Sequence, residues 1–75
     1  MKIVEMKEKT DLEKANEALA GLKPNVTTAD RKDSGRDWRT VNVYLSGQGT
    51  DLETAVELLK FFRERIEERR KVINA

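Results

Sequence analysis

The C-terminal part of the chain, from Gly49 to Ile73, has an apolar pattern with helical spacing and contains both phenylalanines. Its apolar residues recur mostly three or four positions apart, which is the period of one helix face. They are Leu52, Ala55, Val56, Leu59, Phe62, Ile66 and Ile73. The pattern predicts one long helix over about 50–73, and the rest of the chain has to be arranged around this helix.

The length of the chain limits how much apolar surface such a helix can bury. The chain has 75 residues and contains no cysteine and no histidine. A chain of this length buries only about 60% of its unfolded surface, so its stability is marginal. Disulfide bonds and zinc sites of the Cys/His type are excluded. We therefore expect a single domain over residues 1–75, in which self-association is the remaining way to bury more apolar surface.

The sequence Thr-Asp-Leu-Glu occurs twice, at residues 10–13 and 50–53. In each copy the threonine hydroxyl and the glutamate carboxylate can bond each other's backbone N–H, which is the capping box that begins a helix. The first copy predicts a helix of about three turns that ends near Gly21, because Pro24 cannot continue it. The second copy predicts the start of the long C-terminal helix. Whether the two copies reflect a duplication is left open.

Three segments have the patterns of β-strands. Residues 1–8 alternate between apolar and polar side chains, and residues 25–31 form a weaker candidate. Residues 37–45 give the strongest strand pattern, and the turn residues 32–36 join the last two strands into a hairpin. One face of that strand carries Val41, Val43 and Leu45, and the other carries Trp38, Thr40, Asn42 and Tyr44.

This order of elements predicts an α+β domain with the arrangement β-α-β-β-α. A parallel pair of strands joined by a helix requires a right-handed crossover, which gives a three-stranded, split β-α-β sheet. The most apolar strand, about 37–45, takes the middle position, and both helices cover one face of the sheet. The other face, with Trp38 and Tyr44, is left open, and such exposure is typical of a binding surface.

The charge balance limits the possible partners. Charged residues make up 39% of the chain, yet the net charge is only +1. A general polyanion binder is usually clearly basic, so this balance argues against that class. No apolar run approaches the ~20 residues that a membrane span needs. The stretch Met1–Met6 is too short for a signal peptide, and charged residues interrupt it too early. We expect no membrane association and a cytoplasmic location.

The residues that usually carry catalysis are scarce in this sequence. Without histidine or cysteine, the chemistry would fall to lysine, carboxylate or hydroxyl groups, which need a pocket that shifts their pKa values. A domain with so few large apolar residues has little volume for one. The loop 46–50 lies between a predicted strand and helix but lacks both glycine-rich phosphate motifs, so we interpret it as a flexible connection. We expect no enzyme, no catalytic residues, no cofactor and no metal.

Four residues of the predicted hairpin are candidates for binding another protein: Arg36, Trp38, Arg39 and Tyr44. Tryptophan, tyrosine and arginine are enriched among the residues that dominate binding energies. The alternative is that Trp38 covers the end of the sheet and packs on an arginine side chain. The function that we predict first is a small, non-enzymatic protein-binding module. Its size is typical of regulators or inhibitors carried by bacteria or their phages.

We also expect this module to act as a homodimer. The predicted helix is longer than the sheet, so its apolar far end projects beyond the domain and could pack against a second copy. A helix of some 23 residues is about 35 Å long, whereas strands of up to nine residues span at most roughly 30 Å. Leu52, Leu59, Ile66 and Ile73 are spaced by seven, as in a coiled-coil seam that Arg69 interrupts. The residues predicted for self-association are Leu58, Phe61, Phe62, Ile66 and Ile73, and the sheet edge is the alternative seam.

The alternative function is a nucleic-acid-binding module that uses the basic segment 31–39 and the C-terminal helix. Phosphates would bind the cations while a base stacks on Trp38. Three aspartates oppose this prediction, since they leave residues 30–39 with a net charge of only +1. Segment 63–71 has five cations against three anions. Its candidate residues are Arg65, Arg69, Arg70 and Lys71.

Overall fold

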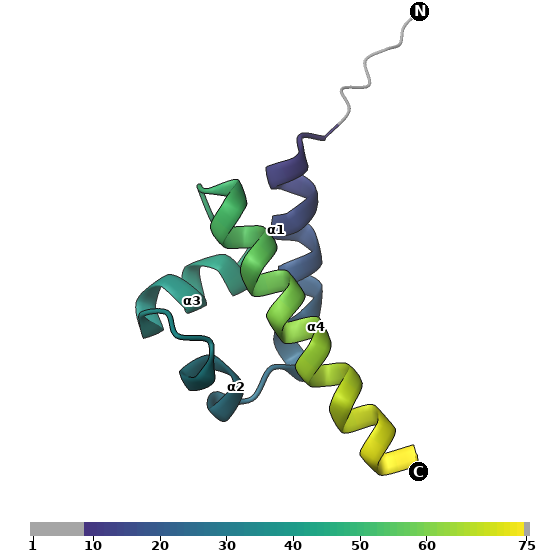
Figure 1. Cartoon of the computed structure of the whole chain (residues 1–75). Helices are drawn as coiled ribbons and strands as arrows, with labels where there is room; N and C mark the ends of the chain where they lie inside the picture. The colour runs from purple at the N-terminus through teal and green to yellow at the C-terminus, as the bar shows by residue number, and fades with distance from the viewer. Residues whose placement is uncertain (1–8, 75) are drawn as a thin grey trace, which may run out of the picture.

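The computed structural model describes residues 9–74, and every regular element in that range is helical (Figure 1). The elements are α1 (Asp11–Leu22), a 3₁₀ turn η1 (Lys23–Asn25), α2 (Thr28–Asp33), α3 (Trp38–Leu45) and α4 (Leu52–Asn74). Residues 9–74 form no strand, so the predicted α+β fold with its split β-α-β sheet is wrong. The strand predicted over residues 1–8 lies outside the described residues.

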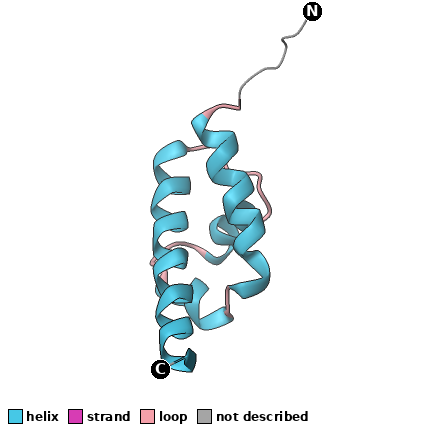
Figure 2. Ribbon diagram, turned by 90° about the vertical axis from the view of Figure 1, so that its right-hand side faces the viewer, coloured by secondary structure: helices cyan, strands magenta, loops and turns pink. Residues whose placement is uncertain are grey.

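The two helices that were predicted, α1 and α4, form the main pair of the fold. They run side by side in the same direction, while α2 and α3 lie together and return the chain to the start of α4 (Figures 1 and 2). Two hydrogen bonds mark this alignment. The Asn16 side chain donates to the Gly49 carbonyl ahead of α4, at 2.8 Å. Near the other end, Arg69 donates to the Asn25 carbonyl, at 2.6 Å.

The core lies where α1, α3 and α4 meet. Its residues are small or apolar and come from all three helices and from the segment after η1: Ala15, Leu19, Val26, Val41, Tyr44, Leu45, Ala55, Leu58 and Phe62. On α4 the buried side chains are three and four positions apart, which places them on one face of the helix. The apolar pattern therefore predicted the helix itself, but of the residues it singled out only Ala55 and Phe62 are fully buried, whereas Leu52 and Val56 are exposed.

Residues 38–45, predicted as the central strand, form helix α3. Val41, Tyr44 and Leu45 are buried, whereas Val43 is 39% exposed. A strand would have placed residues 41, 43 and 45 on one face, but a helix places residues 41, 44 and 45 together. The β-branched and aromatic side chains favoured a strand by propensity, and the burial of one helical face outweighs that preference.

The turn between α2 and α3 is a helix–helix connection, not a hairpin. Gly35 has a φ of 79°, in the left-handed region that glycine adopts without steric cost. Asp37 then begins α3, because its carboxylate accepts a hydrogen bond from the backbone N–H of Arg39 at 3.0 Å. Residues 32–36 were predicted to join two strands, whereas the chain turns here between two helices.

Side-chain caps begin the other helices as well. The box of Thr10 and Glu13 is confirmed, with reciprocal bonds of 3.1 and 3.0 Å. At α4 the backbone N–H of Thr54 donates to the Asp51 carboxylate at 3.0 Å. The cap of α4 is therefore one residue later than the box predicted over residues 50–53.

A second capping box, which was not predicted from the sequence, begins α2. The Thr27 hydroxyl accepts from the backbone N–H of Asp30 at 3.1 Å, and the Asp30 carboxylate accepts from the Thr27 N–H at 3.2 Å. Because these bonds satisfy the N–H groups of a helix start, residues 28–33 become helical. The weak strand predicted over residues 25–31 is therefore wrong.

Candidate functional site

Three of the four residues predicted to bind a partner lie at the surface. Trp38 is 46% exposed in the first turn of α3, and Arg39 beside it is also exposed. Arg36 lies just before α3 and forms an ion pair with Glu57 of α4. Tyr44 is only 6% exposed and belongs to the core. Because Trp38 and Tyr44 both belong to helix α3, the open sheet face that was to hold them together does not exist.

Tyr44 holds the connection between α3 and α4. Its hydroxyl accepts a hydrogen bond from the backbone N–H of Asp51 at 3.0 Å. Its ring lies against Gly49, so close that a Cβ built on the glycine would be 2.2 Å from ring carbons. The residue that looked like an exposed aromatic is thus part of the packing that fixes the start of α4.

Trp38 is held in place by an arginine of α2. The guanidinium carbon of Arg31 lies 5.7 Å from the centre of the Trp38 ring, within the range of a cation–π contact. The same guanidinium donates to the Asn42 side chain of α3 at 3.3 Å. The predicted packing of the tryptophan on an arginine is therefore found, and the ring is still nearly half exposed.

The residues predicted for self-association are mostly used within one chain. Leu58 and Phe62 are buried in the core, while Phe61 and Ile66 are half-buried against it. The rings of Phe61 and Phe62 meet edge to face with their centres 5.5 Å apart. The side chain of Ile73 lies outside the described residues. Among the described side chains of α4, the large apolar residues that are exposed are Leu52, Val56 and Val72.

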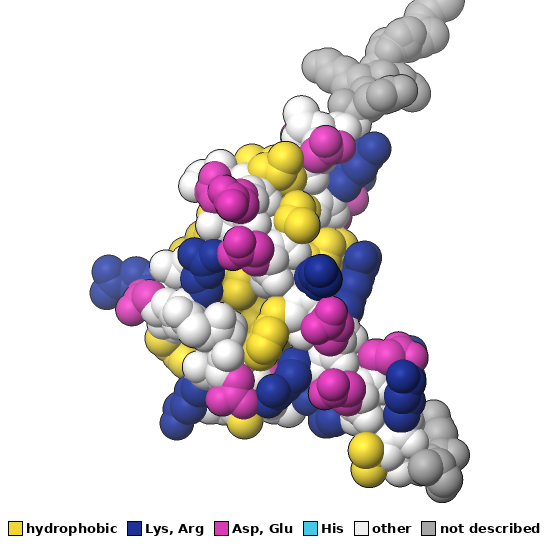
Figure 3. Space-filling view, in the orientation of Figure 1, with side chains coloured by type: hydrophobic (Ala, Val, Ile, Leu, Met, Phe, Trp, Pro, Cys, Tyr) yellow, Lys and Arg dark blue, Asp and Glu magenta, His cyan; other side chains and the backbone are white. Residues whose placement is uncertain are grey.

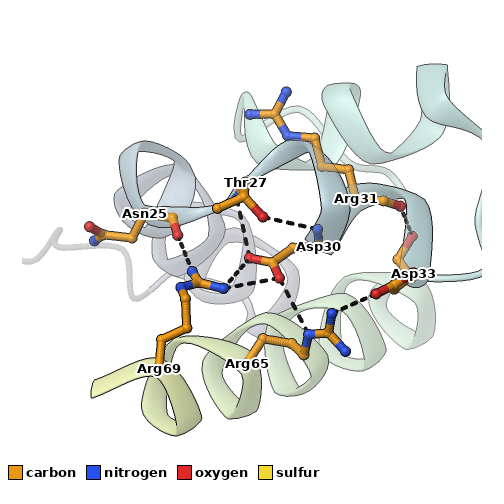
Figure 4. Close-up of polar contacts among 8 residues, drawn as sticks. Asn25, Thr27, Asp30, Arg31, Asp33, Arg65 and Arg69 are labelled. Atoms are coloured by element: carbon orange, nitrogen blue, oxygen red, sulfur yellow. Dashed lines mark hydrogen bonds and ion pairs between the residues drawn. The ribbon is translucent and has the colours of Figure 1, made fainter. Parts of the chain in front are cut away.

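A buried carboxylate joins α2 to α4 (Figure 4). Asp30 is 2% exposed, and its carboxylate accepts hydrogen bonds from Arg69 Nη1 at 2.8 and 3.0 Å. Arg65 Nε donates to the same carboxylate at 3.3 Å. Asp30 was not singled out from the sequence. The signal that could have found it is the Thr27-x-x-Asp30 spacing of a capping box.

The two arginines extend this network to neighbouring groups. Arg69 also donates to the Asn25 carbonyl at 2.6 Å, and Arg65 to the Asp33 carboxylate at 2.5 Å. Helix α2 contains no apolar side chain larger than alanine. It is therefore attached to α4 by charged hydrogen bonds, and two of the arginines predicted to bind phosphates are already bound to carboxylates.

The charges of the network also set the pKa of Asp30. Burial raises the pKa of this carboxyl, but the Thr27 N–H and the guanidinium groups of Arg69 and Arg65 lower it by more. The pKa of Asp30 therefore lies below its ordinary value. Conversely, the carboxylates of Asp33 and Asp30 raise the pKa of Arg65. Both shifts favour the ion pairs.

We expect Asp30→Asn to lower the free energy of unfolding by about 2–3 kcal/mol at neutral pH. Removing one partner of a buried ion pair costs roughly 3–5 kcal/mol, and the arginines here are about a third exposed, which reduces the cost. The pKa of Asp30 is lower in the folded protein than in the unfolded chain. The stability that its ion pairs contribute is therefore complete above the pKa of the unfolded chain, and it is lost as the pH falls through the pKa of the folded protein. Urea denaturation between about pH 7 and pH 2 measures both effects.

The matched control for this prediction is Asp33→Asn, whose side chain is 53% exposed. Exposed ion pairs contribute only about 0–1 kcal/mol, so this variant should lose much less stability than Asp30→Asn. The wild-type protein should lose stability as the pH falls below about 4, and the Asp30→Asn variant should show a smaller loss over the same pH range. Equal losses for the two variants would show that the Asp30 network does not fix α2.

A shallow groove runs along this network between α2 and α4. Its volume is about 570 Å³, and it is lined by Thr27, Ala29, Asp30, Arg65, Glu68, Arg69 and Val72. Three of its charged side chains already bond one another, so the groove offers no unpaired charge of theirs to a ligand. Among the described residues no group of acidic side chains is arranged to hold a metal ion.

Comparisons of the chain with protein-family models, curated proteins and solved structures found no match. Within residues 9–74, none of the helices has the length and apolar character needed to cross a membrane. The most distinctive surface feature is the ordered, half-exposed Trp38 between α2 and α3.

Proposed function

We propose that this protein is a small protein-binding module without catalytic activity, and that it binds its partner through Trp38. The observation that carries the proposal is the 46% exposure of a tryptophan whose ring is fixed by Arg31. Tryptophan and arginine are the residues most enriched where binding energy is concentrated. A ring that is already ordered loses little conformational entropy on binding, which favours affinity.

The nucleic-acid alternative has less support. It relied on the cations of segment 31–39 together with those of the C-terminal helix. Arg65 and Arg69 are bound to Asp30 and Asp33, and Arg36 is paired with Glu57. A phosphate backbone would have to compete with these carboxylates, so the number of cations that favour it is smaller than the sequence indicates.

Self-association stays a prediction, but the residues that would carry it change. Leu58 and Phe62 stabilise the single chain, so a dimer seam cannot use them without unfolding the core. The exposed apolar residues Leu52 and Val56, on the first two turns of α4, are the better candidates for a homodimer. A regulator or inhibitor of this size would combine such a seam with the Trp38 surface.

The variant Trp38→Ala tests the proposed function. We expect the affinity for the physiological partner, isolated from source lysate and then purified, to fall at least about 30-fold, as for a hot-spot residue. The free energy of unfolding should change by less than about 1 kcal/mol, because the ring is half exposed. Val43→Ala, an exposed apolar residue of the same helix, serves as the control and should leave the affinity unchanged. Unaltered binding by Trp38→Ala would contradict the proposal.

A further inference from the structure

Two of the three aspartates in segment 30–39 are paired with arginines of α4 and not with the cations of that segment. Asp30 and Asp33 point toward α4, where Arg65 and Arg69 bind them (Figure 4). The Asp37 carboxylate is occupied at the start of α3, where it accepts the backbone N–H of Arg39. The net charge of +1 for residues 30–39 therefore sums charges that face different sides of α2. Asp30 and Asp33 face α4, whereas Arg31 faces Trp38.

Of the four cations of the same segment, Arg36 is paired with Glu57 of α4, whereas Arg31 extends in another direction. Arg31 extends from α2 away from the Asp30 network and contacts the uncharged side chains of Trp38 and Asn42 (Figure 4). Lys32 and Arg39 are exposed on α2 and α3. In the space-filling view, lysine and arginine side chains project from the side of the molecule that α2 and α3 form, with aspartate or glutamate side chains beside them (Figure 3).

We propose that the surface made by Arg31, Lys32, Trp38 and Arg39 binds an acidic protein segment, in which carboxylates flank an apolar side chain. This inference rests on the proposed function and adds the chemistry of the partner. The apolar side chain covers the exposed part of the Trp38 ring, and the carboxylates bond the surrounding cations. An arginine binds a carboxylate through two parallel N–H donors, which gives the contact direction as well as strength.

The charge balance supports an acidic partner on this side. Arg31 contacts the Trp38 ring, Arg39 is the next residue in the chain, and the exposed Lys32 follows Arg31 on α2. The carboxylate nearest to Trp38 in the chain is that of Asp37, which also caps the start of α3. Complementary charge increases the rate of encounter and selects against basic partners. The patch is short and centred on one aromatic ring, whereas single-stranded nucleic acids are bound along a groove that follows several phosphates. A carboxylate-bearing peptide fits this arrangement better than a nucleic acid does.

The experiment selects binders from a random peptide display library on the full chain, with Trp38→Ala used for counter-selection. We expect the Trp38-dependent binders to be enriched in Asp and Glu beside Leu, Ile or Phe. Trp38-dependent binders that are neutral or basic would overturn the acidic partner and leave the proposed function standing. If no Trp38-dependent binder emerges, the proposed function fails together with the inference.

A titration then measures the charge requirement directly, because Trp38 is the only tryptophan in the chain and reports its own burial by fluorescence. We expect Arg39→Glu to weaken the selected acidic peptide at least about tenfold, and Lys60→Glu on α4 to change its affinity less than about twofold. Replacing the acidic residues of the peptide by amides should weaken it as Arg39→Glu does. Tighter binding of an oligothymidylate than of the peptide, lost steeply with salt, would overturn the inference in favour of a nucleic acid.

Discussion

Replacing Phe62 by alanine is expected to lower the free energy of unfolding by about 3–5 kcal/mol. The side chain is fully buried in the core, whose other residues come mainly from α1, α3 and α4. Its removal loses the transfer free energy of a phenyl ring and leaves a cavity that the neighbouring helices can fill only partly. A domain of this length has roughly 4–11 kcal/mol of stability in total, so the variant should be close to unfolded at physiological temperature.

Phe61→Ala is the matched control, since its ring is half-buried and meets that of Phe62 edge to face. Its loss should be smaller, about 1–2 kcal/mol, because part of the ring surface is already in water. Thermal unfolding followed by circular dichroism gives both values. If Phe62 were a dimer contact instead, its effect would depend on protein concentration between about 5 and 100 µM. We expect no such dependence of the difference in Tm between the variant and the wild type.

The row of α4 that is spaced by seven is not the row that is buried in the core. Leu52 and Ile66 belong to a row spaced by seven, but Leu52 is exposed and Ile66 only half-buried. The buried row is Ala55, Leu58 and Phe62. At 100° per residue the two rows are neighbours on one helix, and a single sequence does not show which of them faces the core when no partner helix is known.

Two arginines continue the buried row beyond the apolar residues. Residues 55, 58, 62, 65 and 69 alternate steps of three and four, so Arg65 and Arg69 lie on the same face as Phe62. From the sequence, both arginines were predicted to be surface cations, because charged side chains are rarely buried without partners. Their partner, Asp30, is more than thirty residues away in the chain, and nothing local indicates the pairing.

The short helices α2 and α3 could have been predicted from their caps. Thr27 and Asp30 have the spacing of a capping box, and Asp37 precedes a run whose positions 41, 44 and 45 fit a helical face. Propensity favoured strands for both segments, because residues 25–31 contain valine and two threonines and residues 37–45 contain valines and aromatic residues. The two longer helices were found because caps, apolar period and propensity agreed there.

The loop between α3 and α4 was interpreted as a flexible connection, but it is packed. The Gly49 carbonyl accepts from the buried side chain of Asn16, and the ring of Tyr44 lies over the glycine. The glycine is required here because no Cβ fits, and not because the chain must bend freely. Sequence alone does not distinguish these two uses of a glycine between elements.

Gly49→Ala should therefore be strongly destabilising, with a loss of at least about 3 kcal/mol in the free energy of unfolding. A Cβ would lie 2.2 Å from carbons of the Tyr44 ring and 2.9 Å from the Asn16 Oδ1. Tyr44 is held in the core, so the backbone has to move, and overpacking of this kind costs about 1–3 kcal/mol or more. The shift also weakens the bonds Asn16–Gly49 and Asp51–Tyr44, each of which contributes about 1 kcal/mol.

Gly21→Ala provides a control with the opposite expected sign. Gly21 lies in α1 and has no atom within 4 Å of a built Cβ. Alanine should raise the stability there by roughly 0.5–1 kcal/mol, because it restricts the unfolded chain and favours the helix. Urea denaturation of both variants then compares the same chemical change at a packed and at an open site. If the two glycines tolerate alanine equally well, the close packing of Tyr44 over Gly49 is not present in solution.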